Sequence, residues 1–383
     1  MEQDTATLLL ELGGVVLGLA VVARLARRFG VPAIPFYLLA GLVFGEGGAL
    51  SLGAAEGFIE TGAEIGLILM LLVLGLEYSA DELVGGLRRS ARSGLIDLVT
   101  NLCPGVIAGL LLGWDPLAAV LLGGVTYISS SGVVAKLLAD LGRVGNRETP
   151  VVLRLLVLED LAMAVYLPVV AALLVGGSTA RVAVSVAIAL GAVGVLLFVA
   201  LRHGERISRL VWSGSSEALL LTLLGLTLLV AGIAERIQLS AAAGAFLVGI
   251  VLSGEVVSHG RGLLLPLRNL FAAVFFVFFG FRVDPGLIPD VAIVATILAV
   301  VTAVTKVLTG WWAAAREGIG VGGRARAGTA LIARGEFSIV VASLGVGIQA
   351  DLAAVAATYV LFLAVAGPLL ARYADPLVGA LRR

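Results

Sequence analysis

The stretch TYISSSGVV, residues 126–134, interrupts a hydrophobic segment with three consecutive serines and a glycine. A second stretch, LIARGEFSIV at residues 331–340, places Arg334 and Glu336 on either side of a glycine inside another hydrophobic segment. Backbone groups freed by a break in a membrane helix are tolerated only where they are buried in protein or line a cavity. Both stretches therefore predict interrupted helices deep inside a membrane protein.

The composition supports this placement. The chain has 383 residues, of which 60% are hydrophobic and 14% are charged, with a mean hydropathy of +1.10, whereas soluble domains carry about 25% charged residues. The hydrophobic runs approach the ~20 residues that a helix needs to cross a bilayer. We therefore predict an all-α polytopic membrane protein with about 13 transmembrane helices, at residues 7–27, 33–49, 61–78, 94–113, 116–139, 150–175, 181–201, 216–235, 239–253, 264–281, 288–312, 324–349 and 352–371.

Lysine and arginine residues divide unevenly between the two sides that this helix count creates. With the N-terminus outside, 21 of the 26 basic residues fall in cytoplasmic connections and 3 in external ones, while Lys306 and Arg334 lie inside helices. Because cytoplasmic loops carry the excess of basic residues, we predict an external N-terminus and a cytoplasmic C-terminus. The acidic start MEQDTATLLL lacks the basic region of a cleaved signal peptide, so the first helix is predicted to be retained.

The two breaks lie seven helices apart, and an odd offset gives the two copies opposite orientations. The sequence therefore predicts two inverted repeats, helices 1–6 and 8–13, joined by helix 7. Interrupted helices at matching positions of two repeats mark the midplane site of a transporter. Close helix packing by small residues is the alternative interpretation of either patch taken alone.

The stretch VLEDLAMAVYLP, residues 157–168, places Glu159 and Asp160 side by side near the middle of the sixth helix. A charge at that depth costs about 2.5–3.5 kcal/mol, so the two acids need partners, protons or cations. Neighbouring helix positions are ~100° apart, so one acid can be paired while the other lines a cavity. Lys306 on the eleventh helix is the predicted partner of Glu159 and a candidate proton carrier, because the chain has 24 arginines but only two lysines and a buried lysine titrates more readily. Snorkelling of Lys306 toward the cytoplasm is the alternative.

The other polar residues within or next to the hydrophobic segments are predicted to have structural roles. Arg334 and Glu336 are predicted to form an ion pair that stabilises the second break, with direct substrate contact as the alternative. Glu77 and Asp97 are predicted to lie at the interfacial ends of their helices. Cys103 is the only cysteine, which excludes an internal disulfide, and neither histidine belongs to a cluster that suggests a metal site.

Four motifs together resemble the second monovalent cation:proton antiporter family over nearly the whole chain. They are the Glu159–Asp160 pair, the SSSG break before it, TKVL at residues 305–308 and RGEFSIV at residues 334–340. GLEYSADEL at residues 75–83 and RGEFSIV are most similar to the Kef-type and Kht-type potassium/proton exchangers. Each motif alone is weak, whereas the combination is specific.

The resemblance implies the sodium/proton antiporter fold and a homodimer in which a core slides against a dimerisation scaffold. The implied domains are scaffold helices 1–3 at residues 1–90, core helices 4–6 at 91–178, connector helix 7 at 179–203, scaffold helices 8–10 at 204–286, and core helices 11–13 with a short cytoplasmic tail at 287–383.

The resemblance also implies that Asp160 binds the transported ion. Glu159 stands where relatives have Asp, Asn or Gln, which leaves the electrogenicity open, and Lys306 stands where relatives pair a lysine with that residue. Glu159 is expected to belong to the ion-binding site together with Asp160, and the further oxygen ligands that a monovalent cation requires are expected from the first break, at Thr126, Ser129, Ser130 and Ser131.

These observations predict a monovalent cation/proton antiporter of the cell (inner) membrane that works by alternating access. Burial disfavours the charged form of a carboxylate, so a proton and a cation are expected to compete for Asp160. Potassium is favoured on the resemblance, with a sodium/proton antiporter as the runner-up. A cation channel is a weaker alternative, because channels repeat a filter around an axis through subunits.

No enzyme activity is predicted, because an intramembrane aspartyl protease would need a second aspartate at the depth of Asp160. No cofactor, nucleic-acid partner or metal other than the transported cation is expected. A Gly-rich dinucleotide fingerprint does not follow the last hydrophobic run, whereas Kef-type relatives carry a nucleotide-binding domain there. The resemblance therefore implies either a separate cytosolic regulatory subunit, as in Kht-type systems, or a regulatory domain removed from this chain.

Overall fold

The computed structural model describes residues 2–29, 33–44, 56–76, 80–174, 179–236, 241–281 and 283–375 of the chain. All regular elements within these residues are helical. They are α1 Glu2–Phe29, α2 Ile34–Phe44, α3 Glu56–Gly75, α4 Ala80–Leu111, α5 Pro116–Tyr127, α6 Ser131–Asp140, α7 Thr149–Leu174, α8 Thr179–Val211, α9 Ser216–Arg236, α10 Ala241–Val251, α11 Glu255–Phe281, the 3-10 helix η1 Pro285–Leu287, α12 Ile288–Arg316, α13 Val321–Ala330, α14 Glu336–Leu344 and α15 Ala350–Arg372.

The two predicted interruptions are present. One hydrophobic segment is split into α5 and α6, and the other into α13 and α14. Eight helices of the described residues are long and apolar enough to cross a membrane, and the count of about 13 crossings stays a prediction. Glu77 lies outside the described residues.

The chain divides into two compact units. The first unit contains residues 1–58, 90–159 and 276–383, and the second contains residues 59–89 and 160–275. The predicted core and scaffold domains have boundaries that differ from those of these two units. That a core moves against a scaffold stays a prediction.

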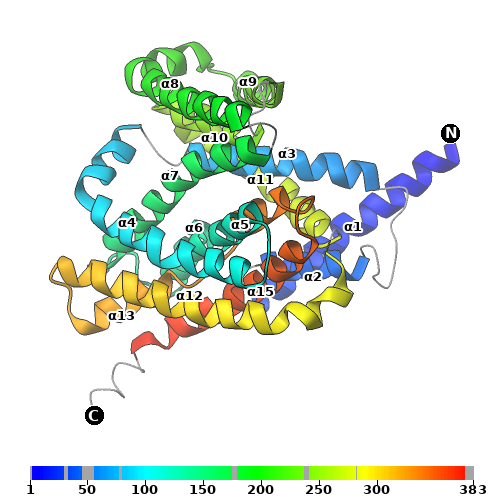
Figure 1. Cartoon of the computed structure of the whole chain (residues 1–383). Coiled ribbons are helices and arrows are strands. Elements are labelled where there is room, and N and C mark those ends of the chain that lie inside the picture. The colour runs from blue at the N-terminus through cyan, green and yellow to red at the C-terminus, as the bar shows by residue number, and fades with distance from the viewer. Residues whose placement is uncertain are drawn as a thin grey trace. The chain divides into compact units, whose positions relative to one another are not determined.

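In the first unit, α12 packs along both α13 and α15, and α14 packs against α5 (Figure 1). Glycines allow the closest of these contacts. A Cβ atom on Gly310 of α12 would lie only 2.6 Å from the Cα atom of Gly328 on α13. Small residues let membrane helices approach to backbone contact, which gains packing energy that apolar side chains alone do not provide in lipid.

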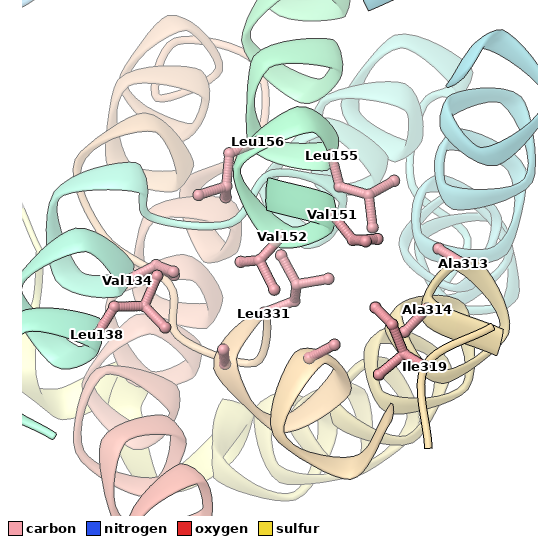
Figure 2. Close-up of a cluster of buried hydrophobic side chains, with 12 residues drawn as sticks. Val134, Leu138, Val151, Val152, Leu155, Leu156, Ala313, Ala314, Ile319 and Leu331 are labelled. Carbon is pink, nitrogen blue, oxygen red and sulfur yellow. The ribbon is translucent and has the colours of Figure 1, made fainter. Parts of the chain in front are cut away.

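A hydrophobic cluster joins α6, α7, α12 and α13 at one end of this unit. Figure 2 shows side chains from α6, α7 and the end of α12 gathered around Leu331, the first residue after α13. Its members are Val134, Leu138, Val151, Val152, Leu155, Leu156, Ala313, Ala314, Ile319, Ala327, Ala330 and Leu331. The second helix break is therefore anchored by apolar packing on one side.

The second unit is held by contacts of α10 with α8 and α9 and by close glycine contacts of α3. A Cβ atom on Gly75 would lie 2.2 Å from the carbonyl oxygen of Phe246 in α10, and one on Gly66 would lie 2.2 Å from that of Phe271 in α11. These positions exclude any side chain without a shift of the backbone, so α3 is closely packed against both helices.

A charged network fastens the end of α15 to the rest of the first unit. Asp375 accepts hydrogen bonds from Arg143 at 3.1 Å and from Arg326 at 2.7 Å, and Arg326 also pairs with Glu148. Burial alone would raise the pKa of Glu148, but hydrogen bonds from Arg326, from the Glu148 backbone and from Asn146 lower it overall. The network ties together the α6–α7 connection, α13 and the residues that follow α15.

Candidate functional site

The two helix breaks lie against each other in the first unit. The backbone N–H of Ser130 donates to the carbonyl oxygen of Ala333 at 2.9 Å, and the Ser338 hydroxyl donates to the carbonyl oxygen of Val125 at 2.8 Å. A Cβ atom on Gly335 would lie 2.5 Å from Ser130 Oγ. Position 335 therefore needs a glycine for this approach, and the two stretches that predicted the breaks pair with each other.

Arg334 satisfies carbonyl groups that the breaks release from helical hydrogen bonding. Its guanidinium is fully buried. It donates to Leu331 O at 3.0 Å, Ile332 O at 3.3 Å, Thr126 O at 3.0 Å and the Tyr359 hydroxyl at 2.9 Å. A buried charge is tolerated when its donors are used in this way. Arg334 therefore bridges both breaks.

Glu336 has a different partner from the one predicted. Its Oε2 accepts a hydrogen bond from the Ser130 hydroxyl at 2.8 Å. In the described residues no ion pair joins Glu336 to Arg334, which corrects the predicted pair. The physical reason is that the freed carbonyl groups compete for the guanidinium, whereas Glu336 begins α14 and faces the other break.

Lys306 lies between two acids in the middle of the first unit. Its Nζ atom is 2.8 Å and 2.9 Å from the two carboxylate oxygens of Asp97, and 2.9 Å from Glu159 Oε1. The side chain of Lys306 is 0% exposed and those of Asp97 and Glu159 are 1% exposed. The predicted contact of Lys306 with Glu159 is present, but it is one of two, and Lys306 does not snorkel toward a surface.

The position of Asp97 corrects the prediction that it lies at a helix end. Asp97 is far inside α4, because the helix begins at Ala80 rather than where the hydrophobic run begins. Asn101, one turn later, donates to Asp97 Oδ1 at 2.9 Å and accepts from the Thr305 hydroxyl at 2.7 Å. Asp97 therefore belongs to the site, and hydrogen bonds from Asn101 and Lys306 fix the position of its carboxylate.

These contacts form part of a polar ladder between α4 and α12, which we define as Asp97, Thr100 and Asn101 with Thr305, Lys306 and Thr309. The hydroxyl groups of Thr100 and Thr309 are 3.1 Å apart. Thr100 and Asn101 follow Asp97 by three and four residues, and Lys306 and Thr305 precede Thr309 by three and four, so the three residues of each helix lie on one face. This period of polar residues in two hydrophobic segments is the sequence signal that could have identified Asp97.

Glu159 connects Lys306 to the first helix break. Its Oε2 accepts a hydrogen bond from the backbone N–H of Ser129. The Ser129 hydroxyl lies 3.2 Å from Glu159 Oε1 and donates to Leu331 O at 2.9 Å. The acid on α7 thus contacts the ammonium and the unwound backbone at the same time.

The other predicted ion ligands occupy varied positions. The Thr126 hydroxyl donates to Asn101 O at 2.9 Å and to Gly123 O at 3.0 Å. Ser131 is half-buried at the start of α6, and Asp160 directly follows Glu159 in α7 with 1% exposure. Within the described part of the chain, no group of three or more His, Cys, Asp or Glu residues could hold a metal ion. The site therefore combines buried carboxylates on α4 and α7 with a buried ammonium on α12 and the unwound backbone of the first break.

Comparison with known proteins extends this picture. Residues 16–374 match the family model described as sodium/hydrogen exchanger, transmembrane. The chain is 32% identical to the K(+)/H(+) antiporter subunit KhtU of Bacillus subtilis, over 95% of this chain and 93% of that protein. It is 28% identical to the ammonium/H(+) antiporter subunit AmhT of Alkalihalophilus pseudofirmus, over 96% and 93%.

The fold also matches a solved structure. The sodium proton antiporter MjNhaP1 from Methanocaldococcus jannaschii superimposes with a TM-score of 0.73, covering 98% of each chain at 18% identity. The predicted sodium/proton antiporter fold is confirmed by this match. Together with the match over most of the sequence, it shows that the chain is a multi-pass membrane protein that belongs to the sodium/hydrogen exchanger family of transporters.

Proposed function

We propose that this protein exchanges a monovalent cation for protons by alternating access, with Asp160 as the residue for which the two ions compete. Membership of an exchanger family supports the reaction class. The observation that carries the proposal is a charged cluster with no exposed member, Asp97, Lys306 and Glu159, at the crossing of two helix breaks. Such a cluster is costly at membrane depth, so intramembrane ionisable groups indicate function.

Potassium is the favoured cation and sodium is the runner-up. The relative KhtU is named a K(+)/H(+) antiporter subunit, which supports potassium, while NhaS3 of Synechocystis, 28% identical over 87% of this chain, is named a high-affinity Na(+)/H(+) antiporter. AmhT is named an ammonium/H(+) antiporter subunit, so ammonium, which is similar in size to potassium, is a third candidate for the transported cation. The oxygen atoms of Ser129, Ser130, Ser131 and Thr126 are the proposed ligands beside Asp160, because unwound backbone and half-helix ends bind cations in transporters of this kind.

The proposal includes the arrangement in the membrane. An external N-terminus, a cytoplasmic C-terminus and residence in the cell membrane rest on the distribution of basic residues. A homodimer with a moving core rests on the resemblance to the antiporter family. The relatives KhtU and AmhT are both named as subunits, which supports a separate regulatory subunit for this chain.

Exchange in proteoliposomes tests the proposal. Purified protein is reconstituted with a pH gradient, and collapse of the gradient is followed after addition of potassium, sodium, rubidium or ammonium. The wild-type protein is expected to respond most strongly to potassium. Asp160→Asn is expected to reduce exchange to the rate of protein-free liposomes, because the amide cannot release a proton.

The matched control is Asp290→Asn, which changes an exposed aspartate in the first turn of α12 and is expected to exchange normally. Wild-type rates in Asp160→Asn would refute the assignment of the ion to Asp160. A strong preference for sodium would reverse the choice of cation, and a current far above transporter turnover would favour the channel.

A further inference from the structure

Lys306 has two acidic partners, and they hold it unequally. Both Asp97 carboxylate oxygens contact the ammonium, at 2.8 Å and 2.9 Å, whereas only one oxygen of Glu159 does, at 2.9 Å. An ammonium has three N–H donors. The distances therefore give two contacts to Asp97 and leave one for Glu159.

The contact with Asp97 is also the better supported of the two. Asn101 fixes the Asp97 carboxylate from the same helix, and the Asn101 amide is in turn bound by Thr305, the neighbour of Lys306. The Thr100–Thr309 contact adds a further rung between α4 and α12. Lys306 is thus attached to α4 through the polar ladder, and the ring of Tyr127 covers it at 5.2 Å.

Glu159 lacks such support from α4 and α12 and is shared with the first break. Its second oxygen accepts the Ser129 backbone N–H, and the Ser129 hydroxyl lies against the first. If Glu159 were the only acid beside Lys306, the ammonium would neutralise the charge of Glu159 fully. With Asp97 present and ionised beside Lys306 and Glu159, the three groups carry one net negative charge, so Glu159 is only partly neutralised.

We infer that Asp97 is a positioning residue that holds the Lys306 ammonium on α4, so that the negative charge of Glu159 remains available to attract the transported cation at the adjacent Asp160. This inference rests on the proposed function. Asp97 is the fixed counterion of Lys306, and Glu159 is the counterion that the cation site shares. Cation affinity is therefore set partly by an acid that does not itself contact the cation.

The test separates KM from kcat for the cation in proteoliposomes at equal pH on both sides. Asp97→Asn removes the charge while keeping the shape, so Lys306 is left to neutralise Glu159. The KM for potassium is expected to rise on the order of tenfold, because removing one negative charge from the buried cluster weakens the attraction for a cation at the neighbouring carboxylate. The kcat is expected to change less than about twofold, and Asp97→Glu is expected to restore the KM.

Thr309→Val is the structural control, because it removes a rung of the same ladder without changing a charge. It is expected to lower the unfolding temperature and to raise the KM much less than Asp97→Asn does, because the charge of Asp97 still holds Lys306. Asp97→Thr is a second charge-removing variant, so that the inference can be tested if Asp97→Asn is not recovered as folded protein. The inferred role of Asp97 would be overturned if the KM were unchanged in a folded charge-removing variant. It would also be overturned if Thr309→Val raised the KM as much as Asp97→Asn does. Neither result would affect the proposed exchange activity. Absence of exchange by the wild-type protein would instead overturn the proposed function, and with it the inference.

Discussion

Loss of Lys306 would leave two buried acids without their counterion, because Asp97 and Glu159 both contact its ammonium. Breaking a buried ion pair by removing one partner costs about 3–5 kcal/mol, since a buried charge is left behind. Lys306→Ala is therefore expected to lower the thermal unfolding temperature of the purified protein by many degrees. Adding Glu159→Ala is expected to recover only part of the loss, because Asp97 still lacks its partner.

A double-mutant cycle in unfolding temperature measures this coupling. Glu217→Ala is a suitable control substitution, because Glu217 is an exposed acid in the first turn of α9. Strictly additive losses for Lys306→Ala and Glu159→Ala would show that the contact has no energetic consequence. Full recovery would show that Asp97 does not depend on Lys306, against the geometry of the site.

At the scale of elements, the approach of the two breaks depends on Gly335. A methyl group there would lie 2.5 Å from Ser130 Oγ and 2.8 Å from Ser130 Cβ. Forcing an extra methyl group into packed protein costs about 1–3 kcal/mol. Gly335→Ala is therefore expected to lower both the unfolding temperature and the exchange rate, because the hydrogen bond between Ser130 and Ala333 must lengthen.

The matched substitution is Gly225→Ala in α9, where a Cβ atom would meet no atom of the described chain within 4 Å. It is expected to leave both properties unchanged or to raise stability slightly, because alanine favours helix over glycine. Equal behaviour of the two variants would mean that the close approach at Gly335 is not required.

The charged network at the end of α15 predicts a pH dependence of stability. The pKa of Glu148 is lowered in the folded protein, mainly because hydrogen bonds from Arg326 and neighbouring donors outweigh the effect of burial. Its contribution to stability is therefore fully present above the free-glutamate value of about 4.3 and is lost as the pH falls through the lower folded value. The unfolding temperature of the wild-type protein is expected to fall more steeply below about pH 4.3 than that of Glu148→Gln. Parallel curves for the two proteins would contradict this prediction.

The sequence predicted the two helix breaks well and the charge partners poorly, for physical reasons. Hydrophobic runs locate helices and their breaks because both are local properties of the chain, and the stretches at residues 126–134 and 331–340 were found in this way. How deep a charged residue lies inside its helix and in the membrane is harder to predict. Asp97 was placed at a helix end because α4 continues through the charged residues before its hydrophobic run. Its contact with Lys306 spans 209 residues.

The hydrogen-bond partners of Arg334 are also not those that the sequence predicts. Proximity in the sequence predicts Glu336 as its partner, yet the guanidinium binds the carbonyl groups of Thr126, Leu331 and Ile332. Sequence proximity identifies a charge partner only when the backbone between the two residues is regular. At this helix break, the unwound backbone places carbonyl groups within reach of the guanidinium and directs Glu336 toward Ser130 of the other break.

At the scale of the whole molecule, the proposed competition between proton and cation at Asp160 predicts a defined pH dependence. The apparent cation constant is K(1 + [H⁺]/Ka), because a protonated carboxyl lacks the charge that the cation needs. Where the site is mostly protonated, each unit fall in pH is expected to raise the constant about tenfold, and where it is mostly ionised the constant is expected to be flat. Steady-state exchange from about pH 6 to 9, with equal pH on both sides, measures this. A constant that stays flat while only the maximal rate changes would instead indicate a separate pH-sensing site.

The long separation of Lys306 from its acids has a consequence for biosynthesis. Asp97 precedes Lys306 by 209 residues and Glu159 precedes it by 147. At about 5–20 residues per second, a ribosome takes roughly 10–40 seconds to make the longer interval. During that time, two acids wait at membrane depth without their ammonium. A nascent chain ending before α12 is expected to be degraded faster than the full chain in a pulse-chase experiment, and Asp97→Asn with Glu159→Gln is expected to slow that degradation. Equal degradation of the truncated chain with and without the two acids would contradict this prediction.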